Sequence, residues 1–239
     1  MIAENLKKVE DKIAESCIKC GRNRSEIRLI AVSKTQPIEV IREAINTGIK
    51  DFGENKAQEL RDKSELFTEN FNWHFIGHLQ TNKIKYVIKS AEFIHAVDSV
   101  KLADEINRKS KEINKNQKVL LEIKTSDEAT KFGLADEKEI FETAQFCKNS
   151  SNLDLVGLMT MAPYTDDENV IRNCFIELRR LKEKLNKNGF ALSELSMGMT
   201  NDYTIAIEEG ATMLRIGTAI FGDRPTGRRA EFINNAGIK

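Results

Sequence analysis

The chain has 239 residues, of which 40% are hydrophobic and 31% charged, enough apolar material for one large core. Lysine plus arginine and aspartate plus glutamate number 37 each, and this zero formal charge gives no general attraction to nucleic acid or to anionic membranes. No apolar run approaches the length of a membrane span, and the N-terminal residues do not resemble a signal peptide. We therefore expect a cytoplasmic protein that binds neither nucleic acid nor membranes.

The first half of the chain alternates predicted helices and strands. A helix is predicted over residues 3–21, because apolar residues recur at helical spacing up to Gly21, a residue type that commonly ends helices. A mostly apolar strand follows over 27–33, and its pattern is typical of a parallel strand covered on both faces. The other strands predicted in this half cover 49–53, 73–78 and 92–97, and the helices 37–47, 54–67 and 79–90. Asp98 or Ser99 can cap the next helix.

The second half continues the same alternation. Strands are predicted over 118–124, 153–159, 194–197 and 212–216, and helices over 136–148, 168–188, about 203–209 and 217–222. Long loops are predicted over 125–134 and 160–167. Eight strand–helix units without a change of composition predict one (β/α)8 TIM barrel over residues 1–239, with an extra N-terminal helix. A doubly wound open sheet is the alternative.

Lys34 stands at the C-terminal end of the first predicted strand. An ammonium ion at the mouth of an apolar barrel is costly to keep charged, which would lower the pKa of this lysine. A neutral lysine amine adds to carbonyl groups and forms a Schiff base. The alternative is an ordinary solvated lysine in a loop.

Glycines and hydroxyl residues follow the seventh and eighth predicted strands: Ser196 with Gly198, and Gly217 with Thr218. Barrels of this kind often bind phosphate between these two loops, at the start of a short extra helix. Glycine lets backbone N–H groups approach an anion, and the hydroxyls add donors. The pattern indicates a phosphate site, although such glycines also serve as turn residues.

Arg215 lies within the apolar eighth strand and must find a partner there, because a guanidinium does not deprotonate. One candidate partner is a carboxylate of another strand, Glu122 or Glu54. The other is a heteroatom of a ligand at the barrel mouth.

The four cysteines do not predict a disulfide framework in a chain of this length. Cys17 and Cys20 form a C-x-x-C pattern inside a predicted helix, while Cys147 and Cys174 lie in separate helices. We expect small, half-buried helix residues and no metal site; a redox or zinc site is the alternative.

Seven motifs together resemble a known family. They are Ala31-Val-Ser-Lys-Thr35, Phe52-Gly-Glu-Asn55, the segment 73–83 (WHFIGHLQTNK), Lys131-Phe-Gly133, Gly157-Leu-Met-Thr-Met161, Leu195-Ser-Met-Gly-Met199 and the segment 215–222 (RIGTAIFG). The chain resembles the fold-type III pyridoxal phosphate (PLP) enzymes, which share the alanine racemase N-terminal barrel. It is more similar to the PLP homeostasis family, known as YggS, PROSC or PLPBP.

The resemblance implies a role for each matching residue. Lys34 would form a covalent aldimine with PLP, and Ser196, Gly217 and Thr218 would hold the phosphate. Arg215 would face the pyridine nitrogen, and Asn55 would contact the ring side. No catalytic residue and no metal site are implied. Residues 123–127 depart from the family's asparagine-containing version, which leaves the role of Lys131 open, and His78 occupies a variable motif position.

Racemases of this fold use a tyrosine from a C-terminal β-domain of a partner subunit, and we find no such domain after the eighth strand. The resemblance therefore implies a monomeric PLP carrier or buffer without a dedicated reaction, which passes the cofactor to PLP-dependent apoenzymes or amines. One alternative is a PLP-dependent amino-acid racemase that uses Tyr164 or a histidine. Another is a cofactor-free Schiff-base enzyme of the class I aldolase type that binds a sugar phosphate.

Overall fold

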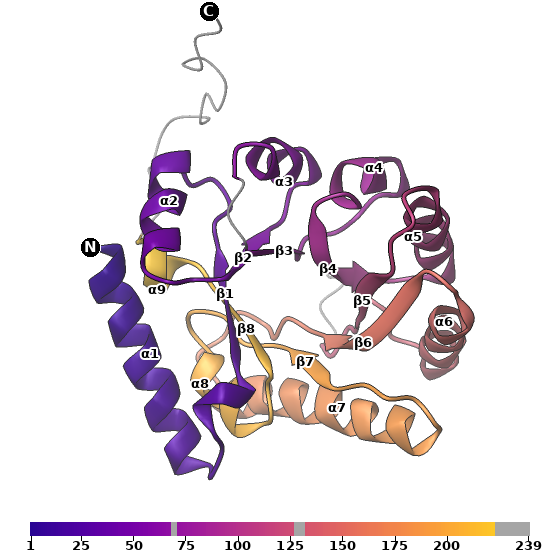
Figure 1. Ribbon diagram of the computed structural model, residues 1–239. Helices are drawn as coiled ribbons and strands as arrows, with labels where there is room; N and C mark the ends of the chain where they lie inside the picture. Colours follow the sequence, from indigo (N-terminus) through magenta and orange to yellow (C-terminus); the bar gives the residue numbers. More distant parts are fainter. Residues whose placement is uncertain (68–70, 127–131, 223–239) are drawn as a thin grey trace, which may run out of the picture.

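Eight parallel strands close into a barrel in the order β1 to β8, with helices around it (Figure 1). The structure is a computed structural model that describes residues 1–67, 71–126 and 132–222. The predicted (β/α)8 barrel is confirmed, and the open sheet is excluded because β1 pairs with both β2 and β8. Lys131 and residues 223–239 lie outside the described residues.

The elements follow the predicted alternation closely. The strands are β1 (Arg28–Val32), β2 (Asp51–Glu54), β3 (Asn72–Phe75), β4 (Ala91–Val97), β5 (Gln117–Glu122), β6 (Leu153–Met159), β7 (Glu194–Ser196) and β8 (Met213–Ile216). The α-helices are α1 (Ile2–Lys19), α2 (Ile38–Asn46), α3 (Ala57–Ser64), α4 (Ile84–Val87), α5 (Val100–Glu112), α6 (Glu137–Asn149), α7 (Glu168–Lys187), α8 (Tyr203–Glu208) and α9 (Thr218–Phe221). Two 3-10 turns, η1 (Arg24–Glu26) and η2 (Thr81–Lys83), complete the list.

Alternate side chains of the strands point into the barrel and out toward the helices. A small apolar cluster fills the interior, made of Ile30, Phe93, Leu120, Met159 and Met213. Their strand neighbours, such as Ala31 and Leu121, belong instead to the larger core under the helices. Each strand is thus covered on both faces, as the apolar run before Lys34 predicts.

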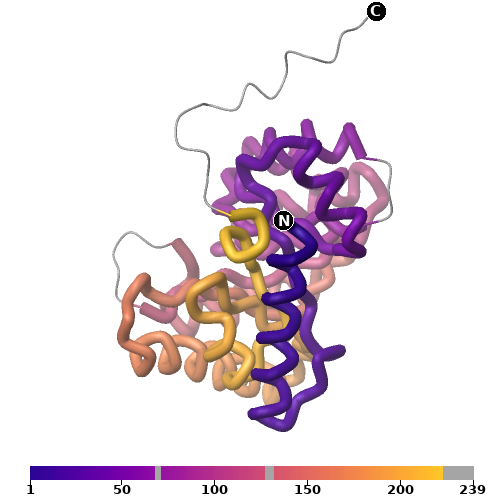
Figure 2. Tube along the Cα trace, turned by 90° about the vertical axis from the view of Figure 1, so that its left-hand side faces the viewer, coloured from indigo at the N-terminus to yellow at the C-terminus, as the bar shows by residue number. Residues whose placement is uncertain are grey.

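Helix α1 packs against the outside of the barrel, beside α8 and α9 (Figure 2). Its buried positions include Val9, Ile13 and Cys17. Arg22, just after the helix, donates hydrogen bonds to the carbonyls of Ile207 and Ala211 and so joins this end of α1 to the α8–β8 connection.

Two predicted boundaries after the third strand are wrong. The strand ends at Phe75 rather than at residue 78, and the predicted helix 79–90 is only the turn η2 followed by α4. A Cβ added at Gly77 would lie 2.2 Å from the carbonyl oxygen of Asn55. The chain after β3 is therefore held against the end of β2, a contact that helical spacing within the segment does not reveal.

The predictions for the cysteines and for the fifth helix can also be compared with the structure. None of the four cysteines forms a disulfide, and no group of three or more possible metal ligands occurs among the described residues.

Ser99 caps α5, because its hydroxyl accepts from the N–H of Leu102. Among the described helices, none combines the length and apolar character that crossing a membrane would need.

Candidate functional site

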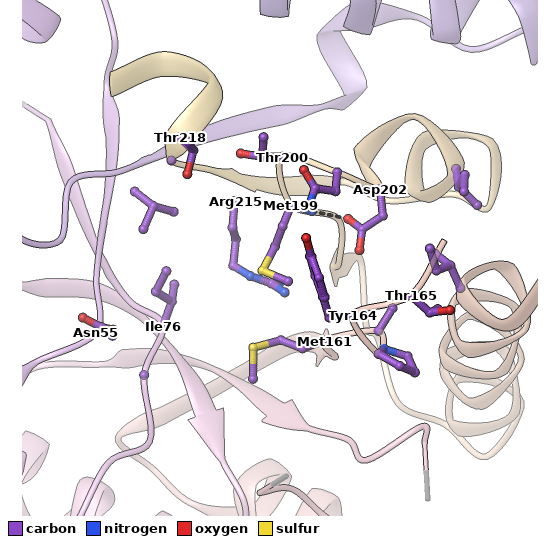
Figure 3. A pocket seen from close by; sticks show the side chains of 18 of the residues that line it. Asn55, Ile76, Met161, Tyr164, Thr165, Met199, Thr200, Asp202, Arg215 and Thr218 are labelled. Atoms are coloured by element: carbon purple, nitrogen blue, oxygen red, sulfur yellow. Dashed lines mark hydrogen bonds between the residues drawn. The ribbon is translucent and has the colours of Figure 1, made fainter. Parts of the chain in front are cut away.

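The C-terminal ends of the strands open into a cavity of about 710 Å³, within the size range of small-molecule sites. Five of the six residues predicted to bind a ligand line this cavity: Lys34, Asn55, Arg215, Gly217 and Thr218. They arrive on the ends of β1, β2 and β8, and several of them are seen in Figure 3. The sixth predicted residue, Ser196, does not line it.

Lys34 lies on a tight turn between β1 and α2. The next residue, Thr35, has a left-handed backbone with φ of 64°, which is uncommon for a residue other than glycine. Its N–H donates to Oε1 of Glu59 at 2.6 Å, and the N–H of Gln36 closes the turn on the carbonyl of Ser33 at 3.0 Å. The turn is therefore fixed by α3 as well as by its own backbone.

A buried ionic cluster of Lys63, Glu54 and Glu59 packs against this turn and stabilises it. Lys63 of α3 is 2% exposed and donates to the Ser33 carbonyl at 2.8 Å, to Glu54 at 2.7 Å and to Glu59 at 2.8 Å. Ser33 also donates its hydroxyl to Oε1 of Glu54 at 2.6 Å. Burial raises the pKa of Glu54 to about 7, although the charge of Lys63 opposes the rise.

The phosphate corner predicted from sequence is formed by the β7–α8 and β8–α9 loops. Gly198 has φ of +94°, and a Cβ there would lie 2.6 Å from Cβ of Ala206, so only glycine fits. The turn brings Thr200 to the cavity wall, where its hydroxyl accepts from the N–H of Ala219 at 3.4 Å. Gly217 also lines the cavity, and Thr218 lies on the same side as Thr200 (Figure 3). The cavity-facing hydroxyl of the β7–α8 loop is therefore that of Thr200, which sequence reasoning missed.

Ser196 lies beneath Arg215 inside the barrel. It is fully buried, and its hydroxyl accepts from Nη1 of Arg215 at 2.6 Å. The second terminal nitrogen of Arg215 donates to the carbonyl of Thr160 at 2.7 Å. Neither carboxylate suggested from the sequence is the hydrogen-bond partner: Glu54 pairs with Lys63, and Glu122 acts on Arg215 only through its charge. Burial lowers the pKa of Arg215 to about 10, against the opposing charges of Asp202 and Glu122.

A chain of polar side chains continues from Ser196 across the barrel interior. Nδ1 of His95 lies 2.9 Å from the Ser196 hydroxyl, Nε2 of His95 lies 3.0 Å from Nδ1 of His74, and Nε2 of His74 lies 2.9 Å from Asp51. Burial lowers the pKa of both histidines, that of His95 well below its usual value. Burial alone would raise the pKa of Asp51, but hydrogen bonds and the charge of His74 lower it overall.

With both histidines neutral, as their lowered pKa values favour, only one arrangement of protons satisfies every bond in this chain. Asp51 as a carboxylate can only accept, so His74 donates from Nε2 and accepts at Nδ1. His95 then donates from Nε2 and accepts at Nδ1, which leaves the Ser196 hydroxyl to donate to His95 and to accept from Arg215. The guanidinium of Arg215 is thus held by a directed chain that begins at the opposite end of the barrel.

The donor set fits a small molecule that carries a phosphate, a carbonyl and an acceptor ring. Lys34 offers an amine, the loops after β7 and β8 offer hydroxyl and backbone N–H groups, and Arg215 offers a buried cation. Tyr164, which is 94% exposed, and His78 also line the cavity. His78 stacks on Phe132 and lies 3.5 Å from Asp98.

Comparison with known proteins agrees with this description. Residues 5–225 match the model of the alanine racemase N-terminal domain. The pyridoxal phosphate homeostasis protein of Aquifex aeolicus is 43% identical over 225 residues, which cover 92% of this chain and 97% of that protein. The protein of the same name from Escherichia coli K12 is 39% identical over 236 residues, or 95% and 99% of the two chains.

Among solved structures, PipY of Synechococcus elongatus PCC7942 with PLP bound is similar at a TM-score of 0.83 and 31% identity, covering 93% of this chain and all of that one. The closed barrel, its strand-end lysine and the matched domain define a (β/α)8 barrel of the alanine racemase N-terminal class. The chain belongs to the pyridoxal phosphate homeostasis protein family.

Proposed function

We propose that this protein binds PLP in the cavity at the C-terminal end of the barrel and acts in PLP homeostasis, as a carrier or buffer of the cofactor. The observation that carries the proposal is the meeting of Lys34, the Thr200–Thr218 corner and buried Arg215 on one cavity. The family membership of the chain and the bound PLP in PipY support it.

Each side chain then has a distinct task. When bound, PLP supplies an aldehyde with which an amine condenses. Lys34 supplies that amine, Asn55 contacts the ring side, and Thr200, Gly217 and Thr218 hold the phosphate. Ser196, predicted from sequence as a phosphate ligand, supports Arg215 instead.

Arg215 also limits what chemistry the site favours. A carboxylate against the pyridine nitrogen would keep that nitrogen protonated and make the ring a strong electron sink. The guanidinium of Arg215 can only donate, so the ring stays neutral and stabilises carbanions poorly. This supports a protein that holds the cofactor rather than one dedicated to turnover.

The proposal is tested by the visible spectrum of the purified protein mixed with PLP. We expect absorbance typical of lysine-bound PLP, and covalent labelling of Lys34 after borohydride reduction. Lys34→Ala should abolish the labelling yet still bind some PLP through the phosphate corner, while Lys83→Ala should behave as wild type. Labelling of Lys34→Ala at the wild-type level would mean that another lysine is the anchor, with Lys83 and Lys131 the next candidates.

We further propose that the protein is a cytoplasmic monomer that passes PLP to PLP-dependent apoenzymes. The absence of disulfides among its four cysteines is in keeping with a reducing compartment. The protein is loaded with PLP and desalted to remove the free cofactor. Mixing it with an apoenzyme should then restore the activity of that enzyme faster than the same concentration of free PLP does. Light scattering gives the oligomeric state directly.

A second candidate function is favoured by Tyr164, an exposed residue among those that line the cavity (Figure 3). A tyrosine there could move the α-proton of a bound amino acid. Tyr164→Phe should then abolish racemisation by the loaded protein, whereas a carrier should bind PLP unchanged. Racemisation by the wild type at ordinary enzyme rates would favour this function over the carrier.

A further inference from the structure

Glu122 is a buried carboxyl group on the wall of the cavity. It is the last residue of β5 and is 4% exposed, on the inner face of the strand that also carries Leu120. In the closed strand order, β5 lies opposite β1, so Glu122 and Lys34 reach the cavity from opposite sides.

The Glu122 carboxyl lacks a hydrogen-bond partner for one of its oxygens. Within the described residues, its Oε2 is buried and accepts no hydrogen bond. Arg215, whose charge acts on Glu122, donates to Ser196 and to the Thr160 carbonyl instead. Leaving a buried carboxyl unsatisfied destabilises a protein, more so when it is ionised.

The surroundings favour the neutral acid. Burial and the nearby charge of Asp98 raise the pKa of Glu122 to about 7, while Arg215 opposes the rise. His78 also lines the cavity, and its Nδ1 lies 3.5 Å from Oδ2 of Asp98. The neutral form of Glu122 is therefore populated near neutral pH, and in that form its carboxyl can donate a hydrogen bond to a ligand.

We infer that Glu122 is a further ligand-binding residue, whose carboxyl donates a hydrogen bond to an acceptor atom of the bound cofactor other than its phosphate and the pyridine nitrogen that Arg215 faces. The inference rests on the proposed function. The phosphate corner belongs to the loops after β7 and β8, and β5 is three strands away from β8, so Glu122 meets the part of the ligand that is not phosphate. Glu122 lines the cavity, so a ligand there can supply the hydrogen-bond partner that the described residues do not give its carboxyl group.

The test compares Glu122→Leu with Glu122→Gln by titrating each protein with PLP. Glutamine keeps a neutral donor, so we expect its dissociation constant to stay within about threefold of wild type. Leucine removes the donor, and we expect binding to weaken by about tenfold or more. The urea midpoint of ligand-free Glu122→Leu should equal or exceed that of the wild type, because an unsatisfied buried group has been removed.

Gln117→Leu is the matched control, since Gln117 is a buried polar residue at the other end of the same strand. It should bind PLP as the wild type does. Binding by Glu122→Leu within twofold of wild type, or an equal loss in Gln117→Leu or Glu122→Gln, overturns the inference while leaving the proposed function intact. A wild-type protein that does not bind PLP overturns both.

Discussion

Single hydroxyl groups decide how the phosphate corner works. Ser196 points into the barrel at an inward position of β7, whereas Thr200 follows the glycine turn and reaches the cavity. The two residues are four positions apart in one motif, and both are good donors. Their different tasks follow from strand alternation before Gly198 and from its left-handed backbone after it.

Thr200→Val should weaken PLP binding by about tenfold or more. A hydrogen bond to a charged group contributes about 1.5–3 kcal/mol, and valine keeps the shape without the hydroxyl. Titration with PLP measures the effect, and titration with inorganic phosphate should show the same loss. Thr165→Val, on the β6–α7 side of the cavity, is the control and should bind normally. Equal affinity in the two variants would remove Thr200 from the phosphate site.

The sequence predicted the positions of Lys34, Asn55, Arg215, Gly217 and Thr218 on the cavity, because each stands at or just after the end of a strand in a recognisable motif. It did not predict what Ser196, Thr200 and Glu122 do. Their roles depend on which way a side chain points and on whether another strand satisfies it. Those facts arise from contacts between segments about 20 to 100 residues apart, such as His95 with Ser196.

At the scale of elements, the β1–α2 turn is held by β2 and α3. Lys63 of α3 ties the Ser33 carbonyl to Glu54 of β2 and to Glu59 of α3. Ser33 precedes Lys34, and Glu59 accepts from the N–H of Thr35, which follows it. The cluster therefore fixes the backbone that carries the Lys34 side chain. The left-handed conformation of Thr35 persists because the surrounding contacts determine it.

Lys63→Met should destabilise the protein by about 3–5 kcal/mol, since removal of one partner leaves Glu54 buried without its cation. Urea unfolding of the ligand-free protein measures the loss. The double variant Lys63→Met with Glu54→Gln should recover a substantial part of it, because the most deeply buried carboxylate of the cluster is then replaced by a neutral amide. As a control, Lys109→Met removes an exposed pair with Glu112 and should cost less than about 1 kcal/mol. No recovery in the double variant would count against this account of the cluster.

The elements also show what periodicity alone can and cannot predict. Eight strands and most helices were predicted from apolar spacing and from glycine, proline and cap residues. The predicted helix after β3 was too long: Ile84, Val87 and Ile88 are apolar residues at helical spacing, but the segment before Thr81 is extended along the end of β2. The constraint at Gly77 comes from Asn55, more than twenty residues earlier.

At the scale of the whole molecule, a hydrogen-bonded chain runs through the barrel beside the apolar interior cluster. It begins at Asp51, the first residue of β2, where Arg28 and Asn72 also donate, and it ends at Arg215 below the cavity. His74 stacks on Phe93 with ring centroids 4.6 Å apart, so the polar chain packs directly on the apolar cluster. The two ends of the barrel are therefore joined by side chains as well as by strands.

Ser196→Ala should lower the free energy of unfolding by about 1–3 kcal/mol, because it leaves His95 without a donor and Arg215 without an acceptor in a buried place. It should also weaken PLP binding, since the guanidinium loses one of its two fixed partners. Urea unfolding and PLP titration measure both effects. Ser193→Ala, on the exposed loop before β7, should change stability by less than about 0.5 kcal/mol. A Ser196→Ala protein as stable as this control would show that the chain does not support Arg215.

The direction of donation along the hydrogen-bonded chain from Arg215 to Asp51 predicts the protonation of both buried histidines. Burial favours the neutral form of His74 and His95, and since Asp51 can only accept, each neutral ring should carry its proton on Nε2 and none on Nδ1. Because burial lowers both pKa values, each ring should stay neutral at pH values just below about 6.5, where an unperturbed histidine already becomes charged. The unfolded chain binds more protons than the folded one in this range, so the two histidines make stability fall as the pH falls below about 6.5. Long-range nitrogen–proton NMR of the ligand-free protein reads the tautomers directly. A proton on Nδ1 of either ring in the ligand-free protein would reverse the direction of the hydrogen-bonded chain and remove its hold on Arg215.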